Sequence, residues 1–468
     1  MGNLGVTTRE GGKRVLTQAE VDGFRSDLRG ALLLPGDGDY DEARRIYNAM
    51  IDKRPALIAR CAGAEDVVRA VTFARDHDLL VSVRGGGHNI AGNAVSDGGL
   101  MIDLSDMKSI QVDPAEQTAR AEPGVTWAEL DKETQAHGLA TPGGTIPSTG
   151  IAGLTLGGGI GWLKGKYGLA CDNLLSVEIV TADGRQLTAS AEDNADLFWG
   201  VRGGGGNFGI VTSFEYRLHP VGKVLGGMAI HPLEKAKDAL AHFRTFMEGT
   251  PDELVCTAVF LTSPDGDPVL AIAVCYHGAL DEGEAVLKPL REFGPPAADN
   301  IAPMDYTALQ SMIEAAFPSG WQNYWKSDAL NDLSDEAIEV MAERFATVPA
   351  PTIAVIVEYT AGAAGRVPVD ATAFPHRETR YNILILGTWP DAADNERNIG
   401  WVRGLWQALQ PFSSGGVYVN YLAEAADEGA ERIQAAYGPR TYGRLVALKN
   451  KYDPTNLFRL NQNIKPTR

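Results

Sequence analysis

The sequence predicts an α+β fold with more than one domain, and three observations support this prediction. The chain has 468 residues, which is more than one ordinary hydrophobic core requires. Residues 222–410 alternate apolar strand-like runs with amphipathic segments, a pattern typical of an antiparallel sheet backed by helices. The flanking segments carry glycine clusters and loops rich in aromatic and polar residues instead. We therefore expect three successive parts, at residues 1–220, 221–410 and 411–468.

Short patterns in the first part predict individual elements. Apolar periodicity and β-rich runs predict helices at 63–77 and 126–138, strands at 79–83, 99–105, 109–113 and 210–218, and a hairpin at 176–190. The second helix begins at Thr126 with Glu129 three residues later, which is a capping box, and Gly138 ends it. The hairpin turns at Asp183 and Gly184.

The same criteria predict the elements of the middle part. Strands are expected at 254–262, 269–277, 353–359 and 381–389, and helices at 232–247 and 335–346. A further segment, residues 320–328 ("GWQNYWKSD"), holds three aromatic side chains and Lys326. It could stack a planar or sugar-like ligand with Lys326 as a donor, although aromatic residues at such spacing also serve as ordinary core.

Composition narrows the range of partners. The net charge of −18 at pH 7 repels phosphate backbones, so we expect no nucleic-acid partner. No apolar run is long enough to span a bilayer, and the N-terminus lacks the apolar core of a secretory signal, so we expect a cytoplasmic protein with no membrane partner. The four cysteines form no CxxC pair and no cluster with zinc-ligand spacing, which predicts no metal site. The sequence predicts no particular oligomeric state.

Glycine clusters are the strongest functional signal in the chain. They lie at 83–92 ("VRGGGHNIAG"), at 143–168 and at 202–209 ("RGGGGNFG"). Glycine permits close approach of the main chain, and bare backbone N–H groups form concave anion sites that suit a pyrophosphate. Three clusters indicate a large dinucleotide-like ligand, although tight turns between strands would also use glycine. The match to G-x-G-x-x-G at 204–209 precedes a strand pattern rather than a helix, which argues against the common dinucleotide-binding fold.

Longer motifs resemble a known family. The segments "RGGGHN", "MIDLSDM", "PGGTIPSTGIAGLTLGGGIGWLKGKYGLACDNLLSVEIVTADG" and "LFWGVRGGGGNFGIVTSFEYRLHP" resemble the PCMH-type FAD-binding domain of the vanillyl-alcohol oxidase family. "FPHR" at 374–377 and the C-terminal "YVNY … YDPTNLFRLNQNI" resemble its berberine-bridge-enzyme-like branch, in particular the bacterial members. The resemblance covers residues 52–220 and 374–468. It implies that the first and third parts form a FAD-binding domain of two α/β subdomains. The middle part is then an inserted substrate domain, with the flavin at the junction.

The resemblance also implies how FAD is held. His88 of the R-x-G-G-H motif would be bonded covalently to the flavin 8α-methyl carbon, and a neutral imidazole is a competent nucleophile near pH 7. Relatives often add a second bond from a cysteine, but Ile146 stands at that position, so we expect one covalent link. Cys171 is expected to be a packed small residue, with a thiol contact to the flavin left open. The implied cofactor-binding residues, besides His88 and Cys171, are Arg84, Gly85, Gly86, Gly87, Asn89, Thr145, Thr149, Gly150, Gly153, Gly157, Gly158, Gly159, Gly161, Asp172, Gly209, Val211, Asn420 and Asn461.

For the reaction, the resemblance implies hydride transfer from a CH–OH or CH–NH carbon of a small organic substrate to flavin N5. O2 would then take the electrons and yield H2O2. Tyr421 matches the usual base, and because a free phenol titrates near about 10, we expect its pKa to be lowered in the fold. Strand geometry would point Tyr418 and Asn420 to one face and Tyr421 to the other. Asn382 follows Tyr381 where plant members carry a catalytic acid, and it can orient a hydroxyl but takes no proton.

Two other functions stay open at this point. The same hydride chemistry could serve a dehydrogenase whose electron acceptor is not O2, and Thr149, at the position that controls access of O2 in the family, does not decide between them. A flavoprotein that only binds its ligand would also keep these motifs.

Overall fold

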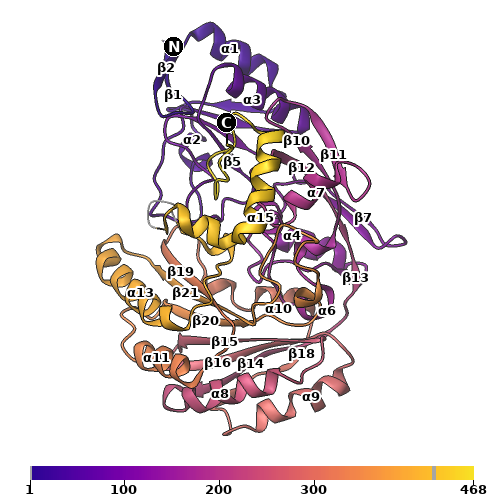
Figure 1. Ribbon diagram of the computed structural model, residues 1–468, viewed down its shortest axis with the longest axis vertical. Helices are drawn as coiled ribbons and strands as arrows, with labels where there is room; N and C mark the ends of the chain where they lie inside the picture. Colours follow the sequence, from indigo (N-terminus) through magenta and orange to yellow (C-terminus); the bar gives the residue numbers. More distant parts are fainter. Residues whose placement is uncertain (1–2, 424–427, 468) are drawn as a thin grey trace.

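The computed structural model describes residues 3–423 and 428–467. Figure 1 shows two halves stacked along the long axis, with the N-terminal half above and a broad sheet with its helices below. The C-terminal helix returns to the upper half, and both ends of the chain lie there. Segments far apart in the sequence therefore meet where the two halves face each other.

The upper half begins with a four-stranded sheet in which β4, β6 and β5 are parallel and β3 pairs antiparallel at the edge. In sheet order its strands are β3 (Ala31–Leu33), β4 (Leu57–Arg60), β6 (Leu100–Asp103) and β5 (Val81–Arg84). Helix α3 (Ala64–Asp76) buries Val67, Val71 and Ala74 in the core beside this sheet. The helix predicted at 63–77 and the strands predicted at 79–83 and 99–105 are confirmed as α3, β5 and β6. Their regularly spaced apolar side chains face one core, as the sequence pattern predicts.

A second sheet of the upper half has five antiparallel strands. In sheet order they are β11 (Gln186–Ser190), β10 (Leu174–Val180), β12 (Ile210–Arg217), β8 (Thr118–Ala121) and β7 (Ile110–Asp113). The predicted hairpin is confirmed as β10 and β11, and Gly184 in its turn has φ of +83°, a conformation that glycine adopts without strain. The strands predicted at 109–113 and 210–218 are confirmed as β7 and β12.

Helix α4 (Trp127–Gln135) carries the predicted capping box. The Glu129 carboxylate accepts a hydrogen bond from the Thr126 backbone N–H at 2.8 Å, and the Thr126 hydroxyl accepts one from the Glu129 N–H. Gly138, with φ of +67°, follows the last turn. The other elements of this half are β1 (Leu4–Thr7), β2 (Lys13–Leu16), α1 (Gln18–Asp27), α2 (Tyr40–Ala43), β9 (Leu139–Ala140), α5 (Ile151–Leu156), α6 (Lys164–Tyr167), α7 (Ala195–Val201) and β13 (His219–Pro220).

The lower half is built on an eight-stranded antiparallel sheet, the type predicted for the middle part. In sheet order its strands are β17 (Ala298–Asp299), β14 (Val224–Pro232), β16 (Pro268–Tyr276), β15 (Leu254–Thr262), β20 (Ala354–Tyr359), β21 (Tyr381–Trp389) and β19 (Gln322–Leu330), with β18 (Ala302–Met304) also paired to β14. The predicted strands of this part are confirmed as β15, β16, β20 and β21.

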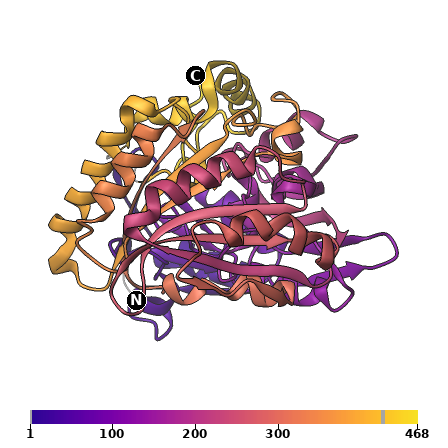
Figure 2. The same ribbon diagram turned by 90° about the horizontal axis from the view of Figure 1, so that it is seen from below.

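The long helices of this half pack on one face of this sheet (Figure 2). They are α8 (Ala236–Met247), α9 (Leu280–Glu292), α11 (Asp335–Phe345) and α13 (Asn395–Leu409), while the short α10 (Tyr306–Ser311) and α12 (Ala363–Arg366) lie in connections. Along β15, Cys256, Ala258 and Phe260 are buried in the core beneath these helices. Successive side chains of a strand point to opposite faces, so Thr257 and Val259 point to the face opposite these helices.

The C-terminal segment departs from the prediction at "YVNY". Residues Val419–Tyr421 form a short 3-10 turn rather than a strand, so the predicted two-sided arrangement of these side chains is wrong. The Asn420 side-chain amide instead donates to the Tyr418 hydroxyl at 2.7 Å. Helix α15 (Ala430–Tyr452) then runs along the upper half (Figure 1) and is kinked at Gly438, where φ is +68°.

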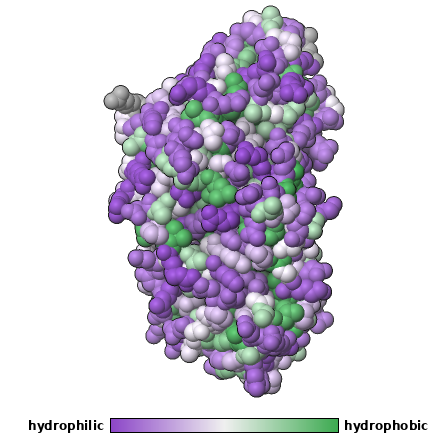
Figure 3. Space-filling view, turned by 90° about the vertical axis from the view of Figure 1, so that its right-hand side faces the viewer, coloured by the Kyte–Doolittle hydropathy of each residue, from purple (hydrophilic) through white to green (hydrophobic). Residues whose placement is uncertain are grey.

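The surface is mostly hydrophilic. On the face drawn in Figure 3, polar and charged side chains predominate, and apolar ones are scattered in small groups. Within residues 3–423 and 428–467, no helix is both long enough and apolar enough to cross a bilayer.

A buried ion pair holds the C-terminal helix to the upper half. The Lys449 ammonium donates to the Asp453 carboxylate and to the backbone carbonyls of Asn207 and Phe458, each at 2.8 Å. Both charged side chains are fully buried. Each buried charge therefore depends on the opposite charge of its partner for electrostatic compensation.

Replacing Asp453 with Ala should leave this buried ammonium without a counter-charge. We expect a loss of about 3–5 kcal/mol in unfolding free energy, measured as a lower midpoint in urea titrations followed by circular dichroism. Lys451→Ala is the control, because it breaks an exposed pair with Asp196 that contributes at most about 1 kcal/mol. Equal shifts for the two variants would contradict this account.

Candidate active site

A cavity of about 320 Å³ lies between the glycine segments of the upper half and the face of the eight-stranded sheet opposite its long helices. Many of the predicted site residues meet in its wall although they come from distant segments. They are Gly85, Gly86, Gly87, His88, Asn89, Thr145, Thr149, Gly150, Gly153, Tyr418, Asn420 and Tyr421. Ile146, at the position of the family's second covalent link, lines the same cavity.

Two glycine loops form one side of this cavity by direct main-chain contact. A Cβ atom on Gly86 would lie 2.5 Å from the Gly150 nitrogen, and a Cβ on Gly150 would lie 2.6 Å from the Gly86 nitrogen. No side chain fits at either position without moving the backbone. The absence of side chains leaves bare main chain facing the cavity, which suits a large cofactor held close to the backbone.

His88 sits beside these loops in a defined orientation. Its ring stacks on Tyr47 with 3.8 Å between centroids and 20° between planes, and the Tyr47 N–H donates to the Gly87 carbonyl at 3.0 Å. Burial lowers the pKa of His88 to about 4, so the imidazole is neutral at pH 7. Its Nε2 atom is shielded from solvent and has no hydrogen-bond partner in the described part of the chain. A neutral imidazole with an unused nitrogen in the cavity wall fits attachment to a cofactor.

Tyr421 lies in a hydrogen-bond network that the sequence did not reveal. Its hydroxyl donates to the Glu358 carboxylate at 3.1 Å, and the Asn382 side-chain amide donates to the other carboxylate oxygen. Glu358 is 6% exposed and lines the cavity. Burial, together with the neighbouring Glu358 charge, raises the pKa of Tyr421 well above its ordinary value. The predicted lowering of this pKa is therefore wrong, and Tyr421 is a neutral phenol at pH 7.

Tyr418 is held from two sides. Its hydroxyl accepts from the Gly159 backbone N–H at 2.8 Å and from the Asn420 amide. Burial raises the pKa of Tyr418 as well. The same Asn420 side chain fills the space where Gly157 has no Cβ. Glycines 157 and 159 therefore support the tyrosine turn from behind and do not line the cavity.

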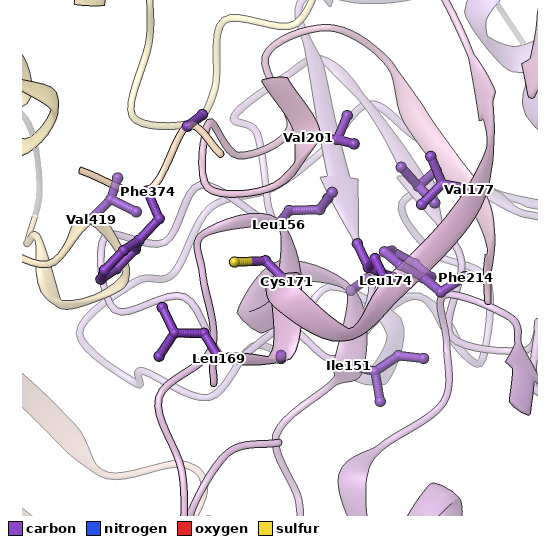
Figure 4. Packing of buried hydrophobic residues seen from close by; sticks show 14 of the residues in the cluster. Ile151, Leu156, Leu169, Cys171, Leu174, Val177, Val201, Phe214, Phe374 and Val419 are labelled. Carbon is purple, nitrogen blue, oxygen red and sulfur yellow. The ribbon is translucent and has the colours of Figure 1, made fainter. Parts of the chain in front are cut away.

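Several other predicted cofactor residues also lie behind the cavity wall. Cys171 is fully buried, and Figure 4 shows it packed among Leu156, Leu169 and Leu174. This is the expected packed small residue, and burial raises the pKa of its thiol. Asp172 forms a two-point ion pair with Arg377 of "FPHR" at 2.7 and 2.8 Å.

The remaining predicted residues have backbone or packing roles. Gly158 lies against the Phe374 ring and Gly161 against the Gly143 carbonyl, with no room for a Cβ at either position. Val211 pairs with Ile179 between strands, and Gly209 lies against the adjoining Val180 carbonyl. The Arg84 guanidinium donates to the Ala43 carbonyl, and the Asn461 amide donates to the carbonyls of Gly206 and Phe458.

The aromatic segment at 320–328 is divided between the two faces of the sheet. Trp325 lines the cavity, and its ring meets that of Tyr421 edge-on with 6.2 Å between centroids. Its indole N–H donates to the Asn323 side chain. Lys326 points the other way and forms a buried ion pair with Glu428 at 2.8 Å. The suggestion that Lys326 is a donor to the ligand is therefore wrong.

The sequence analysis missed two residues of this site, Glu358 in the cavity wall and Tyr47 stacked on His88. Glu358 had one visible signal, because it is a lone charge in the apolar run "IAVIVEYT", and a charge in a buried strand is rarely without a function or partner. Tyr47 had no local signal, since its contact with His88 arises from tertiary packing.

Comparison with known proteins fits this geometry. A model described as FAD binding domain matches residues 55–190, and one described as berberine and berberine like matches residues 417–465. (R)-6-hydroxynicotine oxidase of Paenarthrobacter nicotinovorans is 35% identical over 451 residues, which is 94% of this chain and 97% of that protein. A FAD-linked oxidoreductase of Dictyostelium discoideum is 33% identical over 452 residues, 95% of this chain and 97% of that protein.

Solved structures agree with the sequence matches. The crystal structure of 6-hydroxy-D-nicotine oxidase from Arthrobacter nicotinovorans has a TM-score of 0.86 at 32% identity and covers 94% of this chain and 98% of its own. A chitooligosaccharide oxidase has the same fold, with a TM-score of 0.86 at 24% identity, 96% of this chain and all of its own being covered. The fold is that of an FAD-binding α+β oxidoreductase of the PCMH type. The chain belongs to the berberine-bridge-enzyme-like family of FAD-linked oxidoreductases.

The contact between the two glycine loops can be tested by substitution. Gly86→Ala places a methyl group against the Gly150 backbone and costs about 1–3 kcal/mol of strain. We expect FAD to bind roughly tenfold more weakly, measured as the ratio of flavin absorbance to protein after purification. Gly206→Ala is the matched control, because a Cβ there meets nothing within 4 Å. If both variants retain FAD equally, the loops do not form the cofactor wall.

Proposed function

We propose that this protein is an oxidase that removes a hydride from a CH–NH or CH–OH carbon of a small organic molecule. The observation that carries the proposal is the buried Glu358 carboxylate, hydrogen-bonded to Tyr421 and facing a cavity whose opposite wall holds His88 and the glycine loops. Bound FAD supplies the chemistry that the side chains lack, because it accepts the hydride and passes the electrons to O2. The oxidase names of the relatives support this reading.

Glu358 is the proton acceptor in this proposal. Oxidation of an alcohol or amine releases the proton of the O–H or N–H bond as the C–H hydride leaves, and a base must take that proton. A carboxylate is suited to this role, whereas the Tyr421 phenol, whose pKa is raised, is not. Tyr421 and Asn382 each donate to one carboxylate oxygen, which fixes the orientation of Glu358. They are positioning residues, and the base role moves from Tyr421 to Glu358.

Two substitutions separate these roles. Glu358→Gln keeps the shape but removes the proton acceptor, so flavin reduction should slow by about 10²–10⁴-fold. Tyr421→Phe removes one hydrogen bond to the carboxylate, and the rate should fall far less, by about tenfold. The measurement is anaerobic bleaching of the flavin by any compound that bleaches the wild type, with Glu248→Gln, an exposed glutamate, as control. A larger loss for Tyr421→Phe than for Glu358→Gln would return the base role to tyrosine.

We further propose that His88 holds the FAD through one covalent bond. The bond joins a ring nitrogen to the 8α-methyl carbon and replaces a C–H bond. Formation of this bond would release the C–H proton and the imidazole N–H proton together with two electrons, which O2 would take up as H2O2. Stacking on Tyr47 holds the imidazole in one orientation, which favours attack on a positioned carbon. The Tyr47 hydroxyl has no hydrogen-bond partner in the described chain, so the ring rather than the hydroxyl carries this role.

The covalent bond between His88 and FAD is detected by in-gel fluorescence of the denatured protein under ultraviolet light. Wild type and Tyr47→Phe should fluoresce equally, because both keep the stacked ring. Tyr47→Leu keeps most of the apolar volume but no planar face, and we expect a clear loss of covalent flavin while dissociable FAD still binds. His88→Ala should lose all band fluorescence. A fully fluorescent Tyr47→Leu band would show that stacking is not needed.

A further inference from the structure

The sheet side of the cavity is almost entirely apolar. Its strands present Val259 and Leu261 from β15, Ile356 from β20, and Leu384 and Leu386 from β21. Among the described residues of this sheet that line the cavity, the polar exceptions are Thr257, Glu358 and the indole of Trp325. The indole N–H is already used by Asn323. This wall therefore offers a ligand one hydroxyl and one carboxylate.

Such a wall is poorly matched to a carbohydrate. Each ring of a sugar carries several hydroxyl groups, and each hydroxyl that loses water without gaining a partner disfavours binding. Apolar carbon, in contrast, is stabilised by burial against valine, leucine and isoleucine side chains. The sheet side of the cavity thus favours a molecule whose surface toward this wall is largely apolar, with few polar atoms there.

Glu358 places a carboxyl group in this wall. Lys164, a buried lysine that lines a separate, smaller cavity, interacts electrostatically with Glu358 but makes no hydrogen bond to it. Burial lowers the pKa of Lys164, and the Glu358 carboxylate acts on it in the opposite direction. Among the described residues no cation forms an ion pair with Glu358, so a cationic group on the ligand would supply a partner for this carboxylate.

We propose that the substrate is an apolar, ring-containing amine whose nitrogen faces Glu358, rather than an alcohol or an oligosaccharide. This proposal rests on the proposed oxidase function and specifies the class of substrate for that function. The ammonium pairs with Glu358 and gives it one proton, which restores the nitrogen lone pair. The C–H bond next to nitrogen then breaks with its electron pair passing to FAD, and a C=N bond forms. O2 takes the two electrons with two protons, one from the transferred hydride and one released by Glu358, and becomes H2O2. Water hydrolyses the iminium product to a carbonyl compound and an ammonium.

The test uses the flavin-loaded protein and matched probes. N-methylbenzylamine and N-methylphenethylamine represent the amines, benzyl alcohol and 2-phenylethanol the matched alcohols, and cellobiose the carbohydrates. Saturable perturbation of the visible flavin spectrum under anaerobic conditions reports binding, and bleaching reports turnover. We expect at least one amine to bind about tenfold more tightly than its alcohol and cellobiose not to bind. In Glu358→Gln the preference for amine should vanish, while binding of the alcohol stays within about twofold.

The possible outcomes separate the substrate class from the oxidase function. Tighter binding or faster bleaching with cellobiose than with the amines would overturn the class and leave the oxidase function intact. An amine preference that survives in Glu358→Gln, or no binding of any amine, would also overturn the class. Amine binding that depends on Glu358 but never bleaches the flavin would support the class and overturn the oxidase function. Leu386→Asn offers a second check, because a polar amide in the apolar wall should weaken amine binding without touching Glu358.

Discussion

The arrangement of the site depends on the contact between Gly86 and Gly150, where two stretches of main chain meet with no side chain between them. The first stretch follows a parallel strand and the second begins a short helix, so each is fixed by its own element. Their contact brings bare backbone to one wall and sets His88 beside it. A Cβ at either position would push the loops apart and carry the imidazole out of place.

Two separately packed cores provide the two sides of the cavity. The upper half contributes backbone and a neutral imidazole, which suit the holding of a cofactor. The sheet of the lower half contributes shape and one carboxylate, which suit the choice and deprotonation of a substrate. The alternation of side chains along the sheet makes this division possible, because one face is buried under helices while the other faces the cavity. Binding of the cofactor and selection of the substrate can therefore vary independently within this fold.

Local features were predictable from the sequence, whereas features that depend on distant contacts were not. The Thr126 capping box and the β10–β11 hairpin follow from neighbouring residues, and the structure confirms both. The family motifs identified His88 because the glycines of the motif and the histidine are adjacent in the sequence. The raised pKa of Tyr421 could not be predicted, since it arises from burial and from Glu358, 63 residues away in the sequence. The prediction that Lys326 is a ligand donor is wrong because neighbouring side chains of a strand point to opposite faces of the sheet. A difference of one position in the strand therefore decides whether a side chain reaches the cavity.

The most direct test of this account is a crystal structure of the flavin-loaded protein. We predict electron density for the isoalloxazine ring inside the cavity, between the glycine loops and the sheet, continuous with the His88 side chain and with Glu358 facing the space left beside it. Density for the flavin outside this cavity, or a carboxylate turned away from it, would contradict the account.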